Sequence, residues 1–149
     1  MLLEAKASTS FADVAGRAPL HIASAMGHVS AVTALLEAGA KPSALDQHGN
    51  TAVHSAAVEA REAALGLLLA ADDGAECLRL RNDDDVLPLH LATGLGDLGC
   101  CALMLAFDAS LASLRVRDEG TPAHTAAEKG HSEVLGSLVP CTDLALTFH

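Results

Sequence analysis

Aromatic residues are almost absent from this chain of 149 residues, which has no tryptophan, no tyrosine and three phenylalanines. Half of the residues are nevertheless apolar, and alanine and leucine supply most of them. Both residues are strong helix formers with compact aliphatic side chains. The composition therefore favours short helices that pack closely together.

Apolar runs long enough to cross a bilayer are also missing. The longest apolar stretches, Ala63–Ala71 and Leu98–Phe107, are far shorter than the roughly 18 residues that a membrane span needs. The N-terminus has no basic flank before an apolar run, so it does not resemble a secretory signal peptide. We expect a soluble intracellular protein, cytoplasmic or nuclear, without direct membrane insertion.

Basic residues are scarce, with nine Lys and Arg against 19 Asp and Glu and a net charge of −10. This balance disfavours sequence-independent nucleic-acid binding, which depends on Lys and Arg. It favours a basic partner through electrostatic steering. The alternative is that the charge only keeps an apolar protein in solution.

The four cysteines, Cys77, Cys100, Cys101 and Cys141, have no regular spacing. A disulfide framework is typical of small secreted domains, and a zinc site needs paired Cys or His ligands at short spacing. We expect free buried thiols and no metal. Acylation and redox sensing stay open as alternatives.

One short motif, by contrast, occurs four times. The copies are Ala18-Pro19-Leu20-His21, Thr51-Ala52-Val53-His54, Leu87-Pro88-Leu89-His90 and Thr121-Pro122-Ala123-His124. Their histidines lie 33, 36 and 34 residues apart (54 − 21, 90 − 54 and 124 − 90). Repetition at such a period indicates a solenoid, in which apolar faces are buried between neighbouring units.

The similarity between units extends beyond the motif. The segments 16–28 and 34–40 make up almost one whole unit, and 2–7 reproduces its second half. This pattern resembles the ankyrin repeat over about Leu2–Val139. The resemblance implies an all-α solenoid of stacked helix-turn-helix units joined by hairpin-like fingers. We expect a single array over 1–149, with a partial repeat at 1–15 and repeats at about 16–48, 49–84, 85–119 and 120–149.

Each repeat should contain two helices. Proline or alanine follows the first motif residue, and proline is tolerated in a first helical turn because its missing N–H would be unpaired there. The predicted first helices are Pro19–Met26, Ala52–Glu59, Pro88–Leu95 and Pro122–Lys129. The predicted second helices are about Ser30–Ala38, Glu62–Ala71, Leu98–Ala106 and Ser132–Val139. Additional residues at 72–78 predict a loop, because insertions in repeat proteins map to loops.

Both ends of the sequence suggest an incomplete array. The chain starts within a repeat at Leu2-Leu3, and no polar capping helix is apparent after Val139. We expect the apolar pairs Leu2-Leu3 and Val134-Leu135 to lack cover.

The four motif histidines invite a metal or catalytic interpretation. They recur once per repeat, however, and one ion with bonds near 2 Å cannot reach successive members. In ankyrin repeats this histidine binds the threonine of its own motif and the backbone of the next unit. We therefore expect His21, His54, His90 and His124 to form a structural ladder. Ala18 and Leu87 lack the threonine hydroxyl, so that bond should be missing in two units.

No sequence motif supports catalysis or cofactor binding. A nucleophile elbow, a phosphate loop and a zinc helix are all absent. The acidic segments 72–76 and 83–85 do not match the ligand spacing of a calcium loop. We expect no enzyme activity, no cofactor and no small-molecule substrate.

In ankyrin proteins the finger tips and the exposed face of the first helices form a groove that binds folded partners. The matching finger positions include Arg17, Gln47, His48, Asn50, Asp83, Asp84 and Val86, and Asp118 and Glu119 in the last finger. The matching helix positions include Met26, Glu59, Leu95, Glu128 and Lys129. Apolar side chains at Met26 and Leu95 suit adaptable contacts, although single exposed apolar residues are common on any surface.

Two functions remain open at this level. The first is a non-catalytic protein–protein interaction module. The second is a regulatory or targeting segment of a larger enzyme or channel whose active domain lies outside this chain.

Overall fold

The computed structural model describes residues 12–71, 73–116 and 120–142, with no side-chain detail after Leu138. These residues form helices and lack extended strands; their only bridge joins Val116 and Gly120. The elements are α2 (Pro19–Met26), α3 (Val29–Glu37), α4 (Ala52–Val58), α5 (Glu62–Ala70), η1 (Ala75–Arg79), α6 (Pro88–Leu95), α7 (Leu98–Phe107), η2 (Ala109–Ser113), α8 (Pro122–Lys129) and α9 (Ser132–Thr142). The predicted all-α solenoid is confirmed. No helix in these segments is long and apolar enough to cross a membrane.

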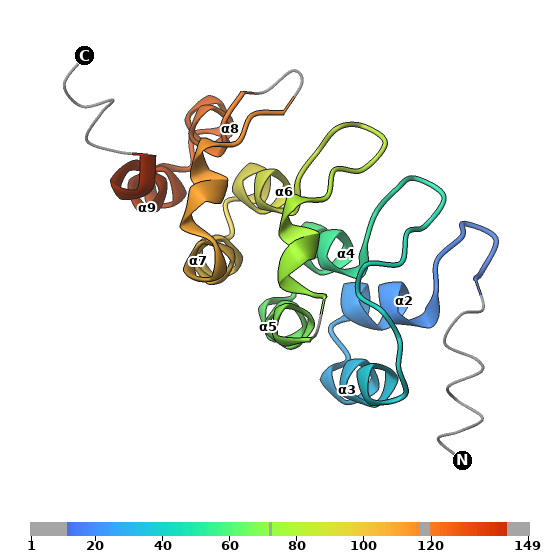
Figure 1. Ribbon diagram of the computed structural model, residues 1–149. Coiled ribbons are helices and arrows are strands. Elements are labelled where there is room, and N and C mark those ends of the chain that lie inside the picture. Colours follow the sequence, from blue (N-terminus) through green and yellow to red (C-terminus); the bar gives the residue numbers. More distant parts are fainter. Residues whose placement is uncertain (1–11, 72, 117–119, 143–149) are drawn as a thin grey trace.

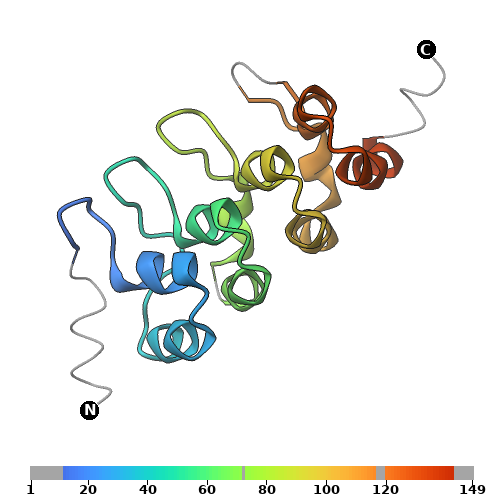
Figure 2. The same ribbon diagram turned by 180° about the vertical axis from the view of Figure 1, so that it is seen from behind.

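The helices stack in two rows (Figure 1). The first helices α2, α4, α6 and α8 contact one another in order, and α3, α5, α7 and α9 form the second row. Figure 2 shows the same two rows from behind, with the loops that join successive units projecting beyond the first row. Small buried residues such as Ala56, Ala57 and Ala92 let the first helices approach closely.

Most helix bounds match the sequence-based predictions. The three first helices that begin with proline have the predicted limits, and α4 ends one residue early at Val58. The second helix α3 begins at Val29 rather than Ser30, and α7 extends to Phe107.

The turns between paired helices use left-handed backbone. Gly27, Gly96 and Gly130 end their first helices with φ of 74°, 76° and 78°. Ala60 takes the equivalent position in the second unit with φ of 58°, although it has a Cβ. Neighbouring Arg61 donates from Nε to the Ala25 carbonyl at 2.9 Å, which links this turn to the preceding unit.

The additional residues at 72–78 are not simply a loop, and that prediction was wrong for their second half. Residues Ala75–Arg79 form the 3-10 helix η1, in which Cys77 and Leu78 are fully buried. A second 3-10 helix, η2, follows α7 and buries Leu111 and Ala112. Both segments bury apolar side chains in the core, so they contribute to packing.

The expectation for the last helix was also wrong. Val134 is 1 % exposed and Leu135 is partly buried against the core, because α9 packs against α8, α7 and η2. Leu2 and Leu3 lie outside the described residues.

Candidate partner-binding surface

Three fingers share one turn geometry. Asp46 accepts hydrogen bonds at Oδ1 from the backbone N–H groups of His48 (2.8 Å) and Asn50 (2.9 Å). Asp13 and Asn82 bind the equivalent N–H groups two and four residues onward, each at 2.9 Å. The fourth turn position has positive φ in each finger, at Gly16 (76°), Gly49 (77°) and Asp85 (65°). These side-chain-capped turns hold the finger tips in one conformation.

The fingers are also bonded to one another. The Gln47 N–H donates to the Ala15 carbonyl at 3.2 Å, and the Asp83 N–H donates to the His48 carbonyl at 2.9 Å. The Asn82 side-chain amide donates to Asn50 Oδ1 at 2.9 Å. A Cβ at Gly49 would lie 2.9 Å from the Asp83 nitrogen, so this close approach requires glycine. The finger tips therefore form one continuous, ordered surface.

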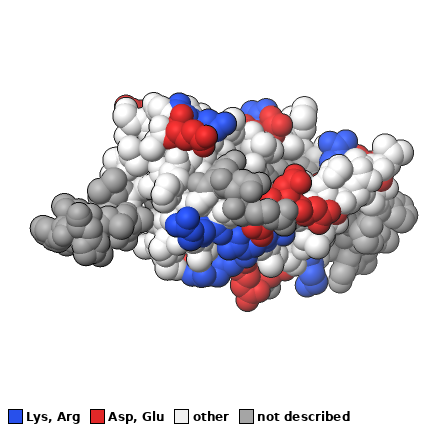
Figure 3. All heavy atoms as spheres, turned by 90° about the horizontal axis from the view of Figure 1, so that it is seen from above, with Lys and Arg blue, Asp and Glu red and all other residues white. Residues whose placement is uncertain are grey.

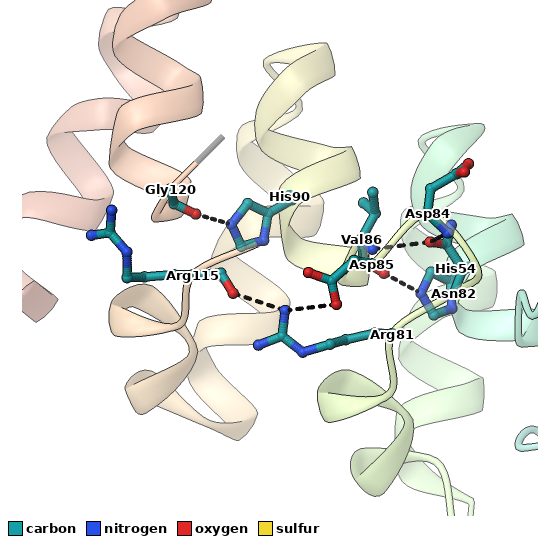
Figure 4. A network of polar contacts seen from close by, with 9 residues as sticks. All are labelled: His54, Arg81, Asn82, Asp84, Asp85, Val86, His90, Arg115 and Gly120. Atoms are coloured by element: carbon teal, nitrogen blue, oxygen red, sulfur yellow. Dashed lines mark hydrogen bonds and ion pairs between the residues drawn. The ribbon is translucent and has the colours of Figure 1, made fainter. Parts of the chain in front are cut away.

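Three motif histidines connect the first helices to the next finger. His21 Nε2 lies 2.9 Å from the Asn50 carbonyl oxygen, His54 Nε2 lies 3.0 Å from that of Val86, and His90 Nε2 lies 2.9 Å from that of Gly120. Figure 4 shows the second and third of these contacts. An imidazole that donates from Nε2 must accept at Nδ1 when it is neutral.

The ring of His54 is held on both sides. Its Nδ1 lies 3.2 Å from the Thr51 nitrogen and 3.0 Å from Thr51 Oγ1. His21 accepts from the Ala18 N–H at 3.0 Å, so the backbone bond persists without the hydroxyl. Burial lowers the pKa of His54 below its ordinary value, with a partly opposing contribution from its bond to Val86. A proton on Nδ1 would also face the Thr51 N–H donor, so the neutral ring suits this site.

His124 differs from the other three. Its Nδ1 lies 2.7 Å from Thr121 Oγ1 in its own motif, and its side chain is exposed. Among the residues that the structure describes, no further finger lies against it.

Most of the predicted partner-binding residues have exposed side chains. These are Arg17, Met26, Gln47, His48, Glu59, Asp83, Asp84, Leu95, Glu128 and Lys129. Asn50 and Val86 are only half-exposed, and their carbonyl groups accept the bonds from His21 and His54. Arg17 binds Asp13 through an ion pair of 2.8 Å. Asp118 and Glu119 lie outside the described residues.

Two apolar side chains stand out among the predicted positions. Met26 is 53 % exposed and Leu95 is 50 % exposed, each at the last residue of a first helix. Val58, which directly precedes the predicted position Glu59 at the end of α4, is 44 % exposed as well.

The described part of the chain contains no group of three or more His, Cys, Asp and Glu residues that could hold a metal ion. Cys77, Cys100 and Cys101 are free and fully buried. Burial is the main cause that raises the pKa of Cys77 and of Cys101 to about 12, and it raises the pKa of Cys100 as well. A thiol needs to ionise to act as a nucleophile, so these groups are poorly suited to catalysis.

These three thiols should be protected from alkylation in the native protein. At pH 8 we expect iodoacetamide to modify Cys77, Cys100 and Cys101 at least about 100-fold more slowly than in denaturant, because reaction requires both exposure and the thiolate. Peptide mass spectrometry after timed quenching measures each site separately. Rapid native labelling would show that η1 opens readily if it occurs at Cys77, or that α7 does if it occurs at Cys100 or Cys101.

Comparison with known proteins identifies the repeat. Residues 1–80, more than half of the chain, match the family model described as ankyrin repeats in three copies. The chain belongs to the ankyrin-repeat family. Ankyrin repeats are generally protein–protein interaction modules without catalytic activity, so the exposed finger tips and first-helix ends become the candidate partner-binding surface.

Relatives with this family's repeats are large and diverse proteins. The chain is 30 % identical over 81 % of its length to the nuclear factor NF-kappa-B p105 subunit of Gallus gallus, covering 12 % of that protein. It is 33 % identical over 74 % of its length to a B-cell lymphoma 3 protein homolog of Mus musculus, covering 25 % of it. It is 32 % identical over 83 % of its length to the tyrosine-protein kinase HTK16 of Hydra vulgaris, covering 16 % of it. The chain thus spans a quarter or less of each.

Proposed function

We propose that this ankyrin array acts inside the cell as a non-catalytic module that binds a folded protein partner. The partner lies in the groove between the finger tips and the exposed ends of the first helices. Gln47, His48, Asp83 and Asp84 contact it from the fingers, and Met26 and Leu95 contact it from the helices. Asp83 and Asp84 favour a basic partner surface.

The observation that carries this proposal is the order of the exposed finger tips. Their polar side chains lie on backbone that is capped by Asp46 and Asn82 and bonded from finger to finger. An ordered loop loses little conformational entropy on binding, so its contacts contribute fully to affinity. Half-exposed Met26 and Leu95 add apolar area that a partner can bury.

A second candidate is a regulatory segment of a larger enzyme. The matching Hydra protein is a tyrosine-protein kinase, and the chain covers only 16 % of it. In that case the same groove would bind either the enzyme's own domain or its substrate.

Kinetic measurements on the groove variants test the first candidate. Against a partner recovered by affinity capture, Asp83→Asn with Asp84→Asn should slow association about three- to tenfold at low salt and little at high salt, because exposed charges act mainly on encounter. Leu95→Ser should speed dissociation about fivefold or more without changing the salt dependence, because a buried apolar contact acts mainly on the dissociation rate.

Changes on the second helices supply the control. Thr33→Ala and Ala70→Ser lie on α3 and α5, away from the fingers, and should leave both rate constants unchanged. If these variants abolish binding while the finger and Leu95 variants bind like the parent, the groove is not the binding site.

A further inference from the structure

Three arginines gather on one edge of an otherwise acidic molecule. Arg79 ends η1, Arg81 follows it by two residues, and Arg115 follows η2 by two residues. The Arg81 guanidinium donates from Nη1 to the Arg115 carbonyl at 2.8 Å, so the two segments lie side by side although 34 residues separate them. Figure 4 shows Arg81 reaching across to the Arg115 backbone between these two segments. Figure 3 shows Lys and Arg atoms lying beside Asp and Glu atoms on the face of the molecule seen from above. We call these three residues the arginine edge.

The arginine edge differs from the groove proposed above. Its residues come from the segments that lead from each 3-10 helix into the next finger, rather than from the finger tips. In Figure 4 the Asp84 side chain points away from the contact between Arg81 and Arg115. The acidic finger tip and the arginine edge therefore present opposite charges in different directions.

Ion pairs hold two of the guanidinium groups in place. Arg79 binds Asp108 with Nη2 and Oδ2 2.9 Å apart and also donates to Ser110. Arg81 lies 3.5 Å from Asp85 through Nη1, the same nitrogen that binds the Arg115 carbonyl. The Arg79 and Arg81 side chains remain 50 % and 37 % exposed. Among the described residues none bonds to Nε or Nη2 of Arg81, and the contacts of Nη1 orient these remaining donors.

Arg115 supplies the charge that no described neighbour balances. Its side chain is exposed, and its guanidinium makes no hydrogen bond or ion pair with another described residue. A guanidinium has five N–H donors in a planar fork that matches the two oxygens of a carboxylate. Arg115 and the open face of Arg81 can therefore bind neighbouring carboxylates.

We propose that the arginine edge binds a short acidic segment of a partner protein, rich in Asp or Glu, beside the groove. Charge complementarity supports this occupant: the edge collects three of the seven basic residues that the structure describes in a chain of net charge −10. A nucleic acid is disfavoured, because binding a phosphate backbone requires many cationic contacts and the net charge opposes it. A partner with basic and acidic regions would thus engage both surfaces in one orientation.

A model acidic peptide tests this inference without the natural partner. The probe is a fluorescein-labelled Gly-Glu-Glu-Gly-Glu-Glu-Gly peptide, compared with the same peptide carrying Gln for Glu. At low ionic strength the acidic peptide should shift the Nε–H NMR signals of Arg81 and Arg115 and saturate in fluorescence anisotropy. Arg115→Gln should weaken binding about two- to fivefold, and the double variant with Arg81→Gln should weaken it about tenfold, as expected for exposed charge pairs.

Lys41→Gln is the matched control, because it removes the same charge from an exposed residue between α3 and α4 that belongs to neither proposed surface. It should weaken binding less than about twofold, since it removes only long-range attraction and no direct charge pair with the peptide. Arg115→Gln leaves the backbone carbonyl that binds Arg81 in place, and its melting temperature should match that of the parent.

Four outcomes would overturn the proposal. The first is an absence of shifts at Arg81 and Arg115, and the second is equal weakening by Lys41→Gln. The third is equally tight binding of a short single-stranded oligothymidylate through the same arginines, which would indicate a nucleic-acid surface. The fourth is self-association in sedimentation equilibrium that Arg115→Gln abolishes, which would make a second copy of the chain the occupant. None of these outcomes changes the association and dissociation rates expected for the groove variants, so each of the two proposals can fail without the other.

Discussion

Replacing Gly74 by alanine should lower the free energy of unfolding by about 3 kcal/mol or more, because the new methyl group overpacks a closed turn. Gly74 lies between α5 and η1, and its N–H donates to the Ala71 carbonyl at 3.1 Å. A Cβ at this position would overlap the Leu68 carbonyl oxygen and lie 2.7 Å from the Leu68 carbonyl carbon. The clash is with backbone, so rotation of a side chain cannot relieve it.

Gly66→Ala is the matched control for this substitution. Gly66 lies within α5, and the nearest atom to its added Cβ would be Leu103 Cδ2 at 3.6 Å, an ordinary contact. Alanine should therefore raise the free energy of unfolding by about 0.5–1 kcal/mol through helix propensity. Urea denaturation monitored by circular dichroism measures both changes. Equal effects of the two substitutions would show that η1 does not pack as the structure describes.

His54→Ala should lower the free energy of unfolding by about 2–3 kcal/mol, because it leaves buried polar groups without partners. The side chain is 1 % exposed and bridges Thr51 of its own unit and the Val86 carbonyl of the next. Its removal also leaves a cavity between α4 and the third finger, which adds to the loss.

Alanine substitutions at two exposed histidines test whether the loss of stability at His54 comes from its burial rather than from the loss of a histidine as such. His48→Ala lies on an exposed finger tip and should change stability by no more than about 0.5 kcal/mol. His124→Ala removes a bond within one motif at an exposed site and should cost about 1 kcal/mol. Coincident denaturation midpoints for His54→Ala and His48→Ala would contradict the ladder.

Local signals made the helices predictable. Proline in the first turn defines where α2, α6 and α8 begin, and glycine ends each of them, because these residues act through their own backbone geometry. The finger turns were predictable for a similar reason: Asp46 caps N–H groups only two and four residues away. The predicted groove could be located only by resemblance, since its residues share no local pattern.

The sequence by itself thus determined the repeat, the helix pairs and the motif histidines, because each depends on contacts within about one repeat length. Only the tertiary structure decided how the irregular segments are used. Residues 75–79 and 109–113 form 3-10 helices with one buried side, because the second helical row leaves apolar area beside them, which Leu78 and Leu111 cover. Ala60 is held in left-handed backbone within a turn that Arg61 links to the preceding unit. Arg81 and Arg115 share one edge because stacking places equivalent positions of successive units side by side, a proximity that sequence spacing cannot show.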